Sequence, residues 1–546
     1  MRERLTSKKI YGAGKLFGSF FAVFSLIFLR YIYFGFVYYP QLDDYIQYHN
    51  YAAMGTLGEM ISYLGLLRAR PLAGILDIAL WSRFWGNMGI ALLLLSMVYA
   101  LSAMVFYCVF QNLYGAGRSF LLFYTLLPIG LEGSYWISAS TRILPGLLFC
   151  ALSAYTFYHY LQNRRFGFLM SAVFFQLLAF CFYEQAAVLS CGLNVIIGFS
   201  MRKTARSRFA AAFSCFGVAA VYFTFCMASG DSALYGGRDT LMLPTTAYYF
   251  RQFLPDLLSQ VYSVFIRGGV LIMTNGIFRG TGIILRSNGV WKLVLYFFVC
   301  ILSFFVCIRA RENNGGGVRR YAVQIGWGAL LALLPLAPFF ILANPYFSLR
   351  GALPSLPGIS LVLDGVFRCL LRKEKLISIA AALCATLFFV VTVSELSDYR
   401  ENYMADTAVT RSIAKTPMHG EKIAVFGLKD SFLATQNFAY HEHISGVTSS
   451  SWALTGAVRC VKENVFEKVT YIPYDSAAEF LYKPWNYEEK QIGGIDAAFV
   501  YDMDANALFP LRVTETGEGV YTLYTEDDAV YGQIVEEGRA AKFFRK

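Results

Sequence analysis

The sequence predicts a mainly α-helical, polytopic membrane protein with about eleven transmembrane helices and a small C-terminal α/β domain. Of the 546 residues, 57% are hydrophobic and only 15% are charged, and the mean hydropathy is +0.48. Apolar runs of membrane-spanning length recur as far as residue 395, and none follows. This composition excludes a soluble globular fold for residues 1–395.

Each long apolar run predicts one transmembrane helix. The runs lie at 14–38, 88–112, 119–135, 142–161, 166–183, 185–200, 209–228, 290–308, 321–343, 352–367 and 376–395. Basic residues occupy alternate gaps, so the positive-inside rule places the N-terminus in the cytoplasm and the C-terminal domain outside. Residues 257–287 strain this scheme, because arginines and glycines interrupt their apolar run. A re-entrant or interfacial hairpin there, or two short spans, would keep the parity of the later loops.

Charge divides the chain at the same place as hydropathy. Residues 396–546 hold 15 basic and 22 acidic side chains, whereas residues 1–395 hold 32 basic and 14 acidic ones. We therefore expect a transmembrane domain over 1–395 and a soluble exterior domain over 396–546, which is long enough for its own core. The basic excess follows from cytoplasmic loops and does not indicate a nucleic-acid partner.

Four short apolar stretches predict strands in the exterior domain. They lie at 422–427, 469–472, 497–501 and 510–535, the last alternating like a meander. These stretches predict an α/β fold for this domain.

The acidic pair Asp43-Asp44 directly follows the first predicted span. Two adjacent carboxylates at a membrane exit are costly unless they lie in water or have a function. Taken alone, the pair is open to two interpretations, a catalytic role or a cap on the next helix.

Several arginines fall in predicted outer loops, where topology does not explain them. Arginine suits phosphate, because its guanidinium group donates two parallel charge-assisted hydrogen bonds and stays charged. The candidates are Arg68, Arg70, Arg142, Arg238 and Arg350, with Glu184 in a tight outer turn. Taken singly, Arg70, Arg142 and Arg350 could instead snorkel to lipid headgroups, and Glu184 could be a solvated turn residue. Tyr135, Trp136 and Tyr235 fit an aromatic belt. The recurrence of carboxylates and arginines on one predicted face favours a site.

Other signatures are scarce. His441-Glu442-His443 looks like a metal cluster, but no third ligand accompanies it. No P-loop, GxSxG, HExxH or dinucleotide fingerprint occurs, which argues against a nucleotide-driven pump.

Taken together, these features resemble the GT-C superfamily of integral-membrane glycosyltransferases, which use a polyprenyl-phosphate sugar donor. The resemblance lies in the run Leu42-Asp43-Asp44, the sequence Arg70-Pro71-Leu72 that begins the next helix, the number of spans and the exterior C-terminal domain. Within the superfamily, the motifs are similar to those of bacterial cell-envelope members, including the serotype-converting glucosyltransferases.

The resemblance implies an inverting hexosyltransferase of the cell membrane that acts on a cell-envelope glycan or lipid at the outer face. It implies Asp43 or Asp44 as the general base. Cations would stabilise the departing polyprenyl phosphate, and aromatic side chains would stack on sugar rings. Its implied substrate-binding residues are Arg70, Arg142, Glu184, Arg238, Arg350, Tyr135 and Trp136. Some GT-C enzymes use a divalent metal and others do not, so the cofactor stays open.

Two other classes remain as alternatives. A transporter or flippase for a lipid-linked sugar should carry ionisable groups within its spans, for which Asp77 and Asp364 are the nearest candidates. A polysaccharide polymerase shares the multi-pass topology but places its arginines in large central loops. The early acidic loop favours the transferase.

Overall fold

A computed structural model describes most of the chain. The described residues are 2–45, 70–201, 215, 217–221, 224, 242–286, 289–308, 318–342, 347–371, 373–428, 444, 446–464, 467–475, 491–537 and 540–545. The chain divides into two compact units. Unit 1 comprises Met1–Tyr38 and Thr56–Leu396, and unit 2 comprises Tyr39–Gly55 and Ser397–Lys546. The beginning of the first predicted outer loop therefore belongs to the same unit as the C-terminal part of the chain.

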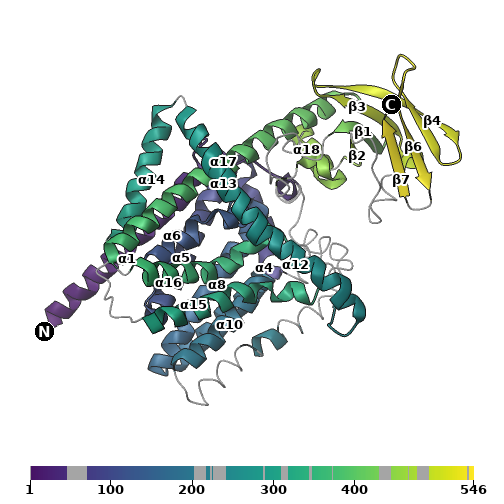
Figure 1. Cartoon of the computed structure of the whole chain (residues 1–546). Coiled ribbons are helices and arrows are strands. Elements are labelled where there is room, and N and C mark those ends of the chain that lie inside the picture. Colours follow the sequence, from purple (N-terminus) through teal and green to yellow (C-terminus); the bar gives the residue numbers. More distant parts are fainter. Residues whose placement is uncertain are drawn as a thin grey trace. The chain divides into compact units, whose positions relative to one another are not determined.

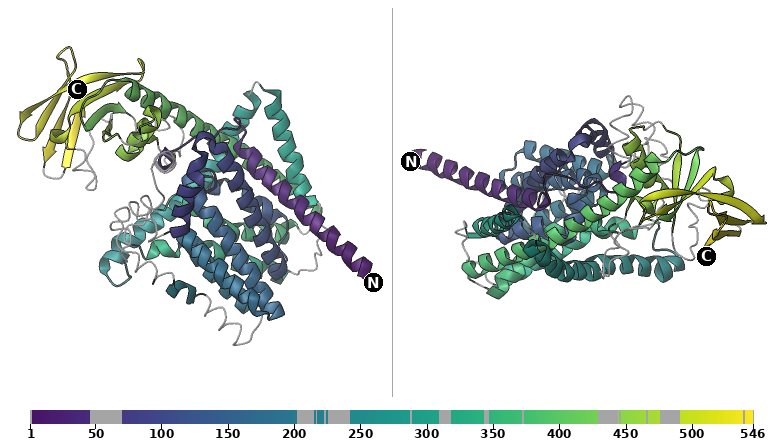
Figure 2. Two further views of the ribbon diagram at one scale, coloured as in Figure 1. Left: turned by 180° about the vertical axis from the view of Figure 1, so that it is seen from behind. Right: turned by 90° about the horizontal axis from the view of Figure 1, so that it is seen from above.

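Unit 1 is helical (Figure 1). Its α-helices are α1 (Arg2–Tyr31), α4 (Pro71–Ala79), α5 (Met88–Tyr114), α6 (Ser119–Leu126), α7 (Leu131–Tyr135), α8 (Ile137–Asn163), α9 (Phe166–Phe182), α10 (Glu184–Met201), α12 (Leu254–Tyr262), α13 (Gly269–Arg286), α14 (Val290–Ile308), α15 (Val318–Leu333), α16 (Leu356–Leu371) and the first part of α17 (Glu374–Lys415). Helix α8 packs against α5, α9 and α10, and the blue helices of this group run alongside one another in Figure 2.

Eight stretches of the described residues are long and apolar enough to cross a membrane. They are Trp81–Tyr114, Ile137–Asn163, Glu184–Met201, Tyr249–Arg286, Val290–Cys307, Val318–Phe340, Leu349–Leu371 and Glu374–Lys415. Phe17–Tyr31 and Phe166–Phe182 are shorter apolar helices. The polytopic helical class is confirmed, whereas eleven spans and their orientation stay predictions.

Two segments differ from the sequence prediction. The single helix expected at 119–135 is broken, since α6 ends at Leu126 and a short 3₁₀ turn begins at Pro128. Proline lacks an N–H and forces the preceding residue out of the helical region. The hairpin or pair of spans expected at 257–287 is wrong, because Tyr249–Arg286 is one continuous helical stretch. The predicted span at 209–228 lies largely outside the described residues.

The glycines that suggested a break in that stretch instead mark a helix crossing. A Cβ atom on Gly280 would collide with the carbonyl oxygen of Val390, and one on Gly276 would lie 2.7 Å from Cγ1 of Val391. Small residues spaced four apart allow two helix backbones to approach closely. Glycine is therefore required here by packing against α17 and not by a turn.

This helix crossing predicts that alanine has opposite effects on stability at two nearby glycines, Gly280 and Gly282. We expect Gly280→Ala to destabilise unit 1 by about 1–3 kcal/mol, because the new methyl group collides with backbone. Gly282→Ala, on the same helix with nothing within 4 Å of its Cβ position, should stabilise by up to about 1 kcal/mol through helix propensity. Thermal unfolding in detergent measures both changes, and equal shifts would contradict the crossing.

Unit 2 contains a seven-stranded sheet with the order β2-β1-β3-β4-β5-β6-β7. Strand β1 (Lys422–Leu428) runs parallel to β2 (Thr470–Asp475) and β3 (Ala497–Asp502), and α18 (Ser451–Lys462) packs against β2. The antiparallel strands are β4 (Ala507–Gly517), β5 (Val520–Tyr524), β6 (Val530–Glu537) and β7 (Ala540–Arg545). All four predicted strand regions are confirmed.

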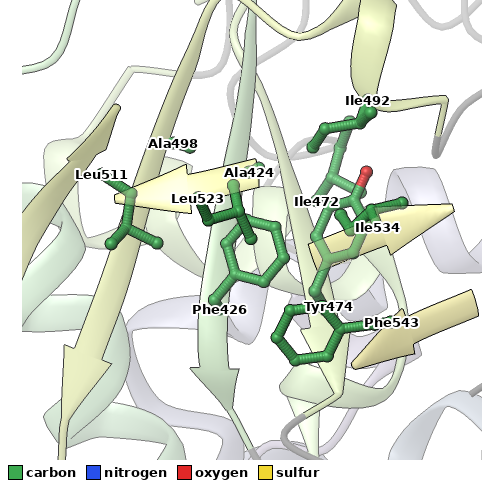
Figure 3. Packing of buried hydrophobic residues seen from close by; sticks show 10 residues of the cluster. All are labelled: Ala424, Phe426, Ile472, Tyr474, Ile492, Ala498, Leu511, Leu523, Ile534 and Phe543. Atoms are coloured by element: carbon green, nitrogen blue, oxygen red, sulfur yellow. The ribbon is translucent and has the colours of Figure 1, made fainter. Parts of the chain in front are cut away.

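The core of this sheet explains why those runs are apolar. The buried side chains shown in Figure 3 come from strands that are far apart in the sequence and, for Ile492, from the short 3₁₀ turn before β3. The ring of Phe426 stacks on that of Tyr474, with centroids 4.5 Å apart, and lies 5.6 Å from the ring of Phe543. Aromatic pairs at such distances add to the stabilisation that burial provides.

Candidate functional site

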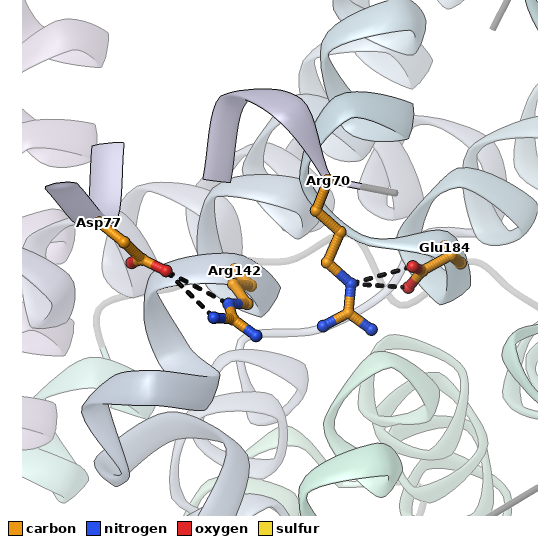
Figure 4. A network of polar contacts seen from close by, with 4 residues as sticks. All are labelled: Arg70, Asp77, Arg142 and Glu184. Carbon is orange, nitrogen blue, oxygen red and sulfur yellow. Dashed lines mark hydrogen bonds and ion pairs between the residues drawn. The ribbon is translucent and has the colours of Figure 1, made fainter. Parts of the chain in front are cut away.

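Two arginine–carboxylate pairs lie in unit 1 (Figure 4). Nε of Arg70, the residue before α4, donates to both carboxylate oxygens of Glu184 at 2.9 and 3.1 Å. Nε and Nη2 of Arg142, in α8, donate to Oδ2 of Asp77, in α4, at 3.3 and 3.2 Å. In Figure 4 the two guanidinium groups lie between the two carboxylates.

The two ion pairs differ in how far their side chains are exposed. The side chains of Asp77 and Arg142 are 1% and 17% exposed, whereas those of Arg70 and Glu184 are 25% and 38% exposed. A buried ion pair is costly to break, whereas an exposed one contributes little to stability. The Arg70–Glu184 pair is therefore the more accessible to a ligand, and the Arg142–Asp77 pair is the more structural.

Tyr183, between α9 and α10, brings the charged groups together. Cζ of Arg70 lies 4.7 Å from the centroid of the Tyr183 ring. Burial raises the pKa of the Tyr183 hydroxyl, Arg70, Arg350 and Arg142 act to lower it, and Glu184 acts to raise it.

Arg350 is placed by a tight packing of short helices. Its Cζ lies 4.9 Å from the ring centroid of Trp136, a cation–π geometry. A Cβ atom on Gly133 in α7 would lie 2.8 Å from the carbonyl oxygen of Arg350, so only glycine allows this approach. Nε2 of Gln185 in α10 donates to the carbonyl oxygen of Gly351 at 3.0 Å, which ties the arginine's turn to α10.

The structure therefore brings together most of the predicted binding residues. Arg70 pairs with Glu184 and lies over the ring of Tyr183, and Arg142 pairs with Asp77. Arg350 lies over the ring of Trp136. Snorkelling does not describe these arginines, because their partners are side chains of the protein. Arg68, Arg238 and Tyr235 lie outside the described residues.

The aromatic belt expected for Tyr135 and Trp136 is wrong. Tyr135 is fully buried and Trp136 is 7% exposed, whereas belt residues face the lipid interface. The ring of Tyr135 packs against those of Tyr31 and Tyr38, at 5.4 and 5.2 Å between centroids. Trp136 lies against Arg350.

Sequence reasoning missed two buried residues of unit 1, Tyr183 and Arg30. Tyr183 carries no motif, and only its place beside Glu184 in a tight turn could have drawn notice. Arg30 is an arginine in the last turn of an apolar helix, which is the available signal. It is fully buried, and its Nη2 donates to the hydroxyls of Tyr31 at 2.6 Å and Ser134 at 3.3 Å.

The second carboxylate predicted within a span, Asp364, is bound by the protein. It accepts hydrogen bonds from the backbone N–H of Gly117 at 2.9 Å and from Nε2 of Gln324 at 2.8 Å. The hydroxyl of Ser119 and Nε of Arg368 donate to it as well. Such a surrounding is that of a structural buried carboxylate.

The acidic pair lies in unit 2. Asp44 is fully buried, and its Oδ2 accepts the backbone N–H of Gln41 at 2.9 Å. Leu42 adopts a φ of +29°, a region that non-glycine residues rarely enter and that occurs at functional sites. Residues 43–45 are themselves helical, so the acidic pair lies within a helical turn and not in front of it.

No group of three or more potential metal ligands occurs among the residues that the structure describes. The run His441-Glu442-His443 lies outside them.

No family model and no curated protein matches the chain. Among solved structures it is similar to ArnT from Cupriavidus metallidurans in the apo state, at 12% identity and a TM-score of 0.38, over 90% of this chain and 94% of that one. The structure of ArnT from the same organism bound to undecaprenyl phosphate matches at 12% identity and a TM-score of 0.36, over 88% and 95%.

Proposed function

We propose that the chain is a membrane glycosyltransferase of the GT-C type, which moves a sugar from a polyprenyl-phosphate donor to a cell-envelope glycan or lipid at the outer face of the cell membrane. The observation that carries the proposal is the placement of the Arg70 and Arg142 guanidinium groups between Glu184 and Asp77, with Arg350 stacked on Trp136 at the start of α8.

In this proposal, the phosphate of the lipid donor binds the arginine cluster at the depth of the lipid headgroups. Arg70 and Arg350 supply charge-assisted donors for phosphate oxygens, and the Arg70–Glu184 pair is exposed enough to exchange partners. Trp136 offers an aromatic face for a sugar ring beside Arg350. These are the interactions that a phosphate leaving group and its sugar require.

The reaction is an inverting displacement. The acceptor hydroxyl oxygen bonds to the anomeric carbon from the side opposite the phosphate, while the bond from that carbon to the phosphate oxygen breaks. The electron pair leaves on the polyprenyl phosphate, where arginines offset the new charge. The acceptor proton passes to Asp43 or Asp44 acting as general base.

A transporter receives no comparable support. Its expected mid-span carboxylates, Asp77 and Asp364, are both held by protein groups at hydrogen-bond distance. Carboxylates that bind a coupling ion need open coordination sites instead.

Sugar transfer by purified protein in liposomes tests the proposal. Polyprenyl-phosphate glucose and related donors are supplied with envelope extracts as acceptors. We expect Arg350→Ala to lower kcat/KM by about 10²–10³-fold, because it removes a donor to the leaving group. The control is Arg512→Ala, which removes an exposed arginine paired with Asp528 in unit 2 and should leave transfer unchanged. Equal rates for the two variants would contradict the assigned site, and folded wild-type protein that consumes no donor would favour a transporter or polymerase.

A further inference from the structure

The segment that holds the acidic pair is fastened to helix α17 through one glutamine. Gln41 is buried, and its Nε2 donates to the carbonyl oxygens of Tyr39 at 3.2 Å and Tyr399 at 3.3 Å. Its Oε1 accepts a hydrogen bond from Nδ2 of Asn402 at 2.8 Å. The amide of Gln41 thus uses both its donor and its acceptor on a segment more than 350 residues away.

Asn402 is in turn fixed within α17. Its Nδ2 also lies 3.4 Å from Oδ2 of Asp406, one helical turn later, and both side chains are buried. Oδ1 of Asp406 accepts the backbone N–H of Val447 at 3.1 Å. A Cβ atom on Gly446 would lie 2.8 Å from Oδ1 of Asp406, so glycine leaves room for this carboxylate.

The same glutamine reaches the carboxylate of Asp44. The backbone N–H of Gln41 donates to Oδ2 of Asp44 at 2.9 Å, so the placement of Gln41 also places this carboxylate. Tyr45 lies among the same elements, because its carbonyl oxygen accepts a hydrogen bond from Sγ of Cys460 in α18 at 3.7 Å. Burial raises the pKa of the Tyr45 hydroxyl, and Asp406 and Asp44 add to this effect. Hydrogen bonds in such a buried chain are electrostatically strong because the local dielectric is low.

We propose that Asn402 and Asp406 are positioning residues that set the orientation of the Asp44 carboxylate through Gln41. The C-terminal unit then has a specific role: it holds the general-base segment in its reactive conformation. The inference rests on the proposed function, since it requires Asp44 to act in transfer. Neither Asn402 nor Asp406 touches substrate in this scheme, so their effect appears in the rate and not in donor binding.

The kinetic test uses Asn402→Ala and Gln41→Ala. Each variant should lower kcat by about 10–100-fold while KM for the donor changes less than about threefold, since small misplacements of a reacting group cost this much. The double variant should be no slower than the slower single one, because both residues act through one chain of contacts. Effects on kcat that multiply, or a loss expressed in KM, would overturn the inference.

Ser412→Ala is the matched control on the same helix. Ser412 is buried in α17 and donates to the carbonyl oxygen of Asn506 at 2.8 Å, away from segment 39–45. Its loss should lower the melting temperature about as much as Asn402→Ala does, and should leave kcat unchanged. A fall in kcat equal to that of Asn402→Ala would reduce the role of Asn402 to stability alone.

Amide hydrogen exchange separates this inference from the proposed function. In Asn402→Ala, exchange within 39–45 should rise at least tenfold over wild type, with no such rise in Ser412→Ala. Unchanged exchange would reject the positioning role even in an active transferase. If exchange rises but the wild-type protein transfers no sugar from any donor, the attachment of segment 39–45 to α17 is supported and the transferase function is rejected.

Discussion

Replacing Asp43 and Asp44 singly by asparagine is expected to abolish sugar transfer in at least one case, while both proteins stay folded. A general base contributes about 10²–10⁴-fold, and an amide cannot accept the proton of the acceptor hydroxyl. Asparagine keeps the shape of aspartate, and its Oδ1 can still accept the N–H of Gln41 that Asp44 accepts now. The measurement is transfer in liposomes by wild type, both single variants and the double variant.

Folding and chemistry are separated by melting temperature. Each asparagine variant should unfold within a few degrees of wild type, so that lost transfer reports the missing carboxylate. Full activity in both single variants would remove the acidic pair from the reaction. Activity retained by Asp43→Asn and lost by Asp44→Asn would assign the base to the buried member of the pair.

The largest effect on stability is expected from Arg142→Met. Asp77 is buried, and removal of its arginine leaves a carboxylate in low dielectric without that partner. Breaking a buried pair in this way costs about 3–5 kcal/mol. The double variant Arg142→Met/Asp77→Leu should recover most of this loss, because it removes the isolated charge together with its partner.

The control for this prediction is Arg70→Met. Its partner Glu184 is over a third exposed, so the change should cost about 1 kcal/mol or less. Equilibrium unfolding in mixed micelles compares the three proteins. A double variant as unstable as Arg142→Met alone, or equal losses at the two arginines, would show that burial does not decide these pairs.

The sequence predicted those features that depend on residues close together in the chain. The strands near 422–427 and 497–501 follow from short apolar runs that fill the sheet core, and the arginine cluster follows from cations where topology expects none. The broken helix at 119–135 was missed because hydropathy outweighed Pro128. Gly276 and Gly280 were read as a break because sequence does not tell a turn from a close helix crossing.

The surroundings of Asp44 could not be predicted for a different reason. Gln41, in the same segment, accepts a hydrogen bond from Asn402, which lies 361 residues later and also contacts Asp406. No local spacing in the sequence predicts such a pairing. The partners are one asparagine and one aspartate on a long helix, residue types that occur there for many reasons. Only the folded chain shows that they meet the first loop.

The two partners of this contact, Gln41 and Asn402, are synthesised at different times. Gln41 leaves the ribosome 361 residues before Asn402, which at about 5–20 residues per second is a delay of about 20–70 s. Throughout that interval the acidic segment lacks its hydrogen-bond partners on α17. A chain cut short before residue 397 would never acquire them. Synthesis of α17 is thus the event that would allow the acidic segment to adopt its fixed conformation.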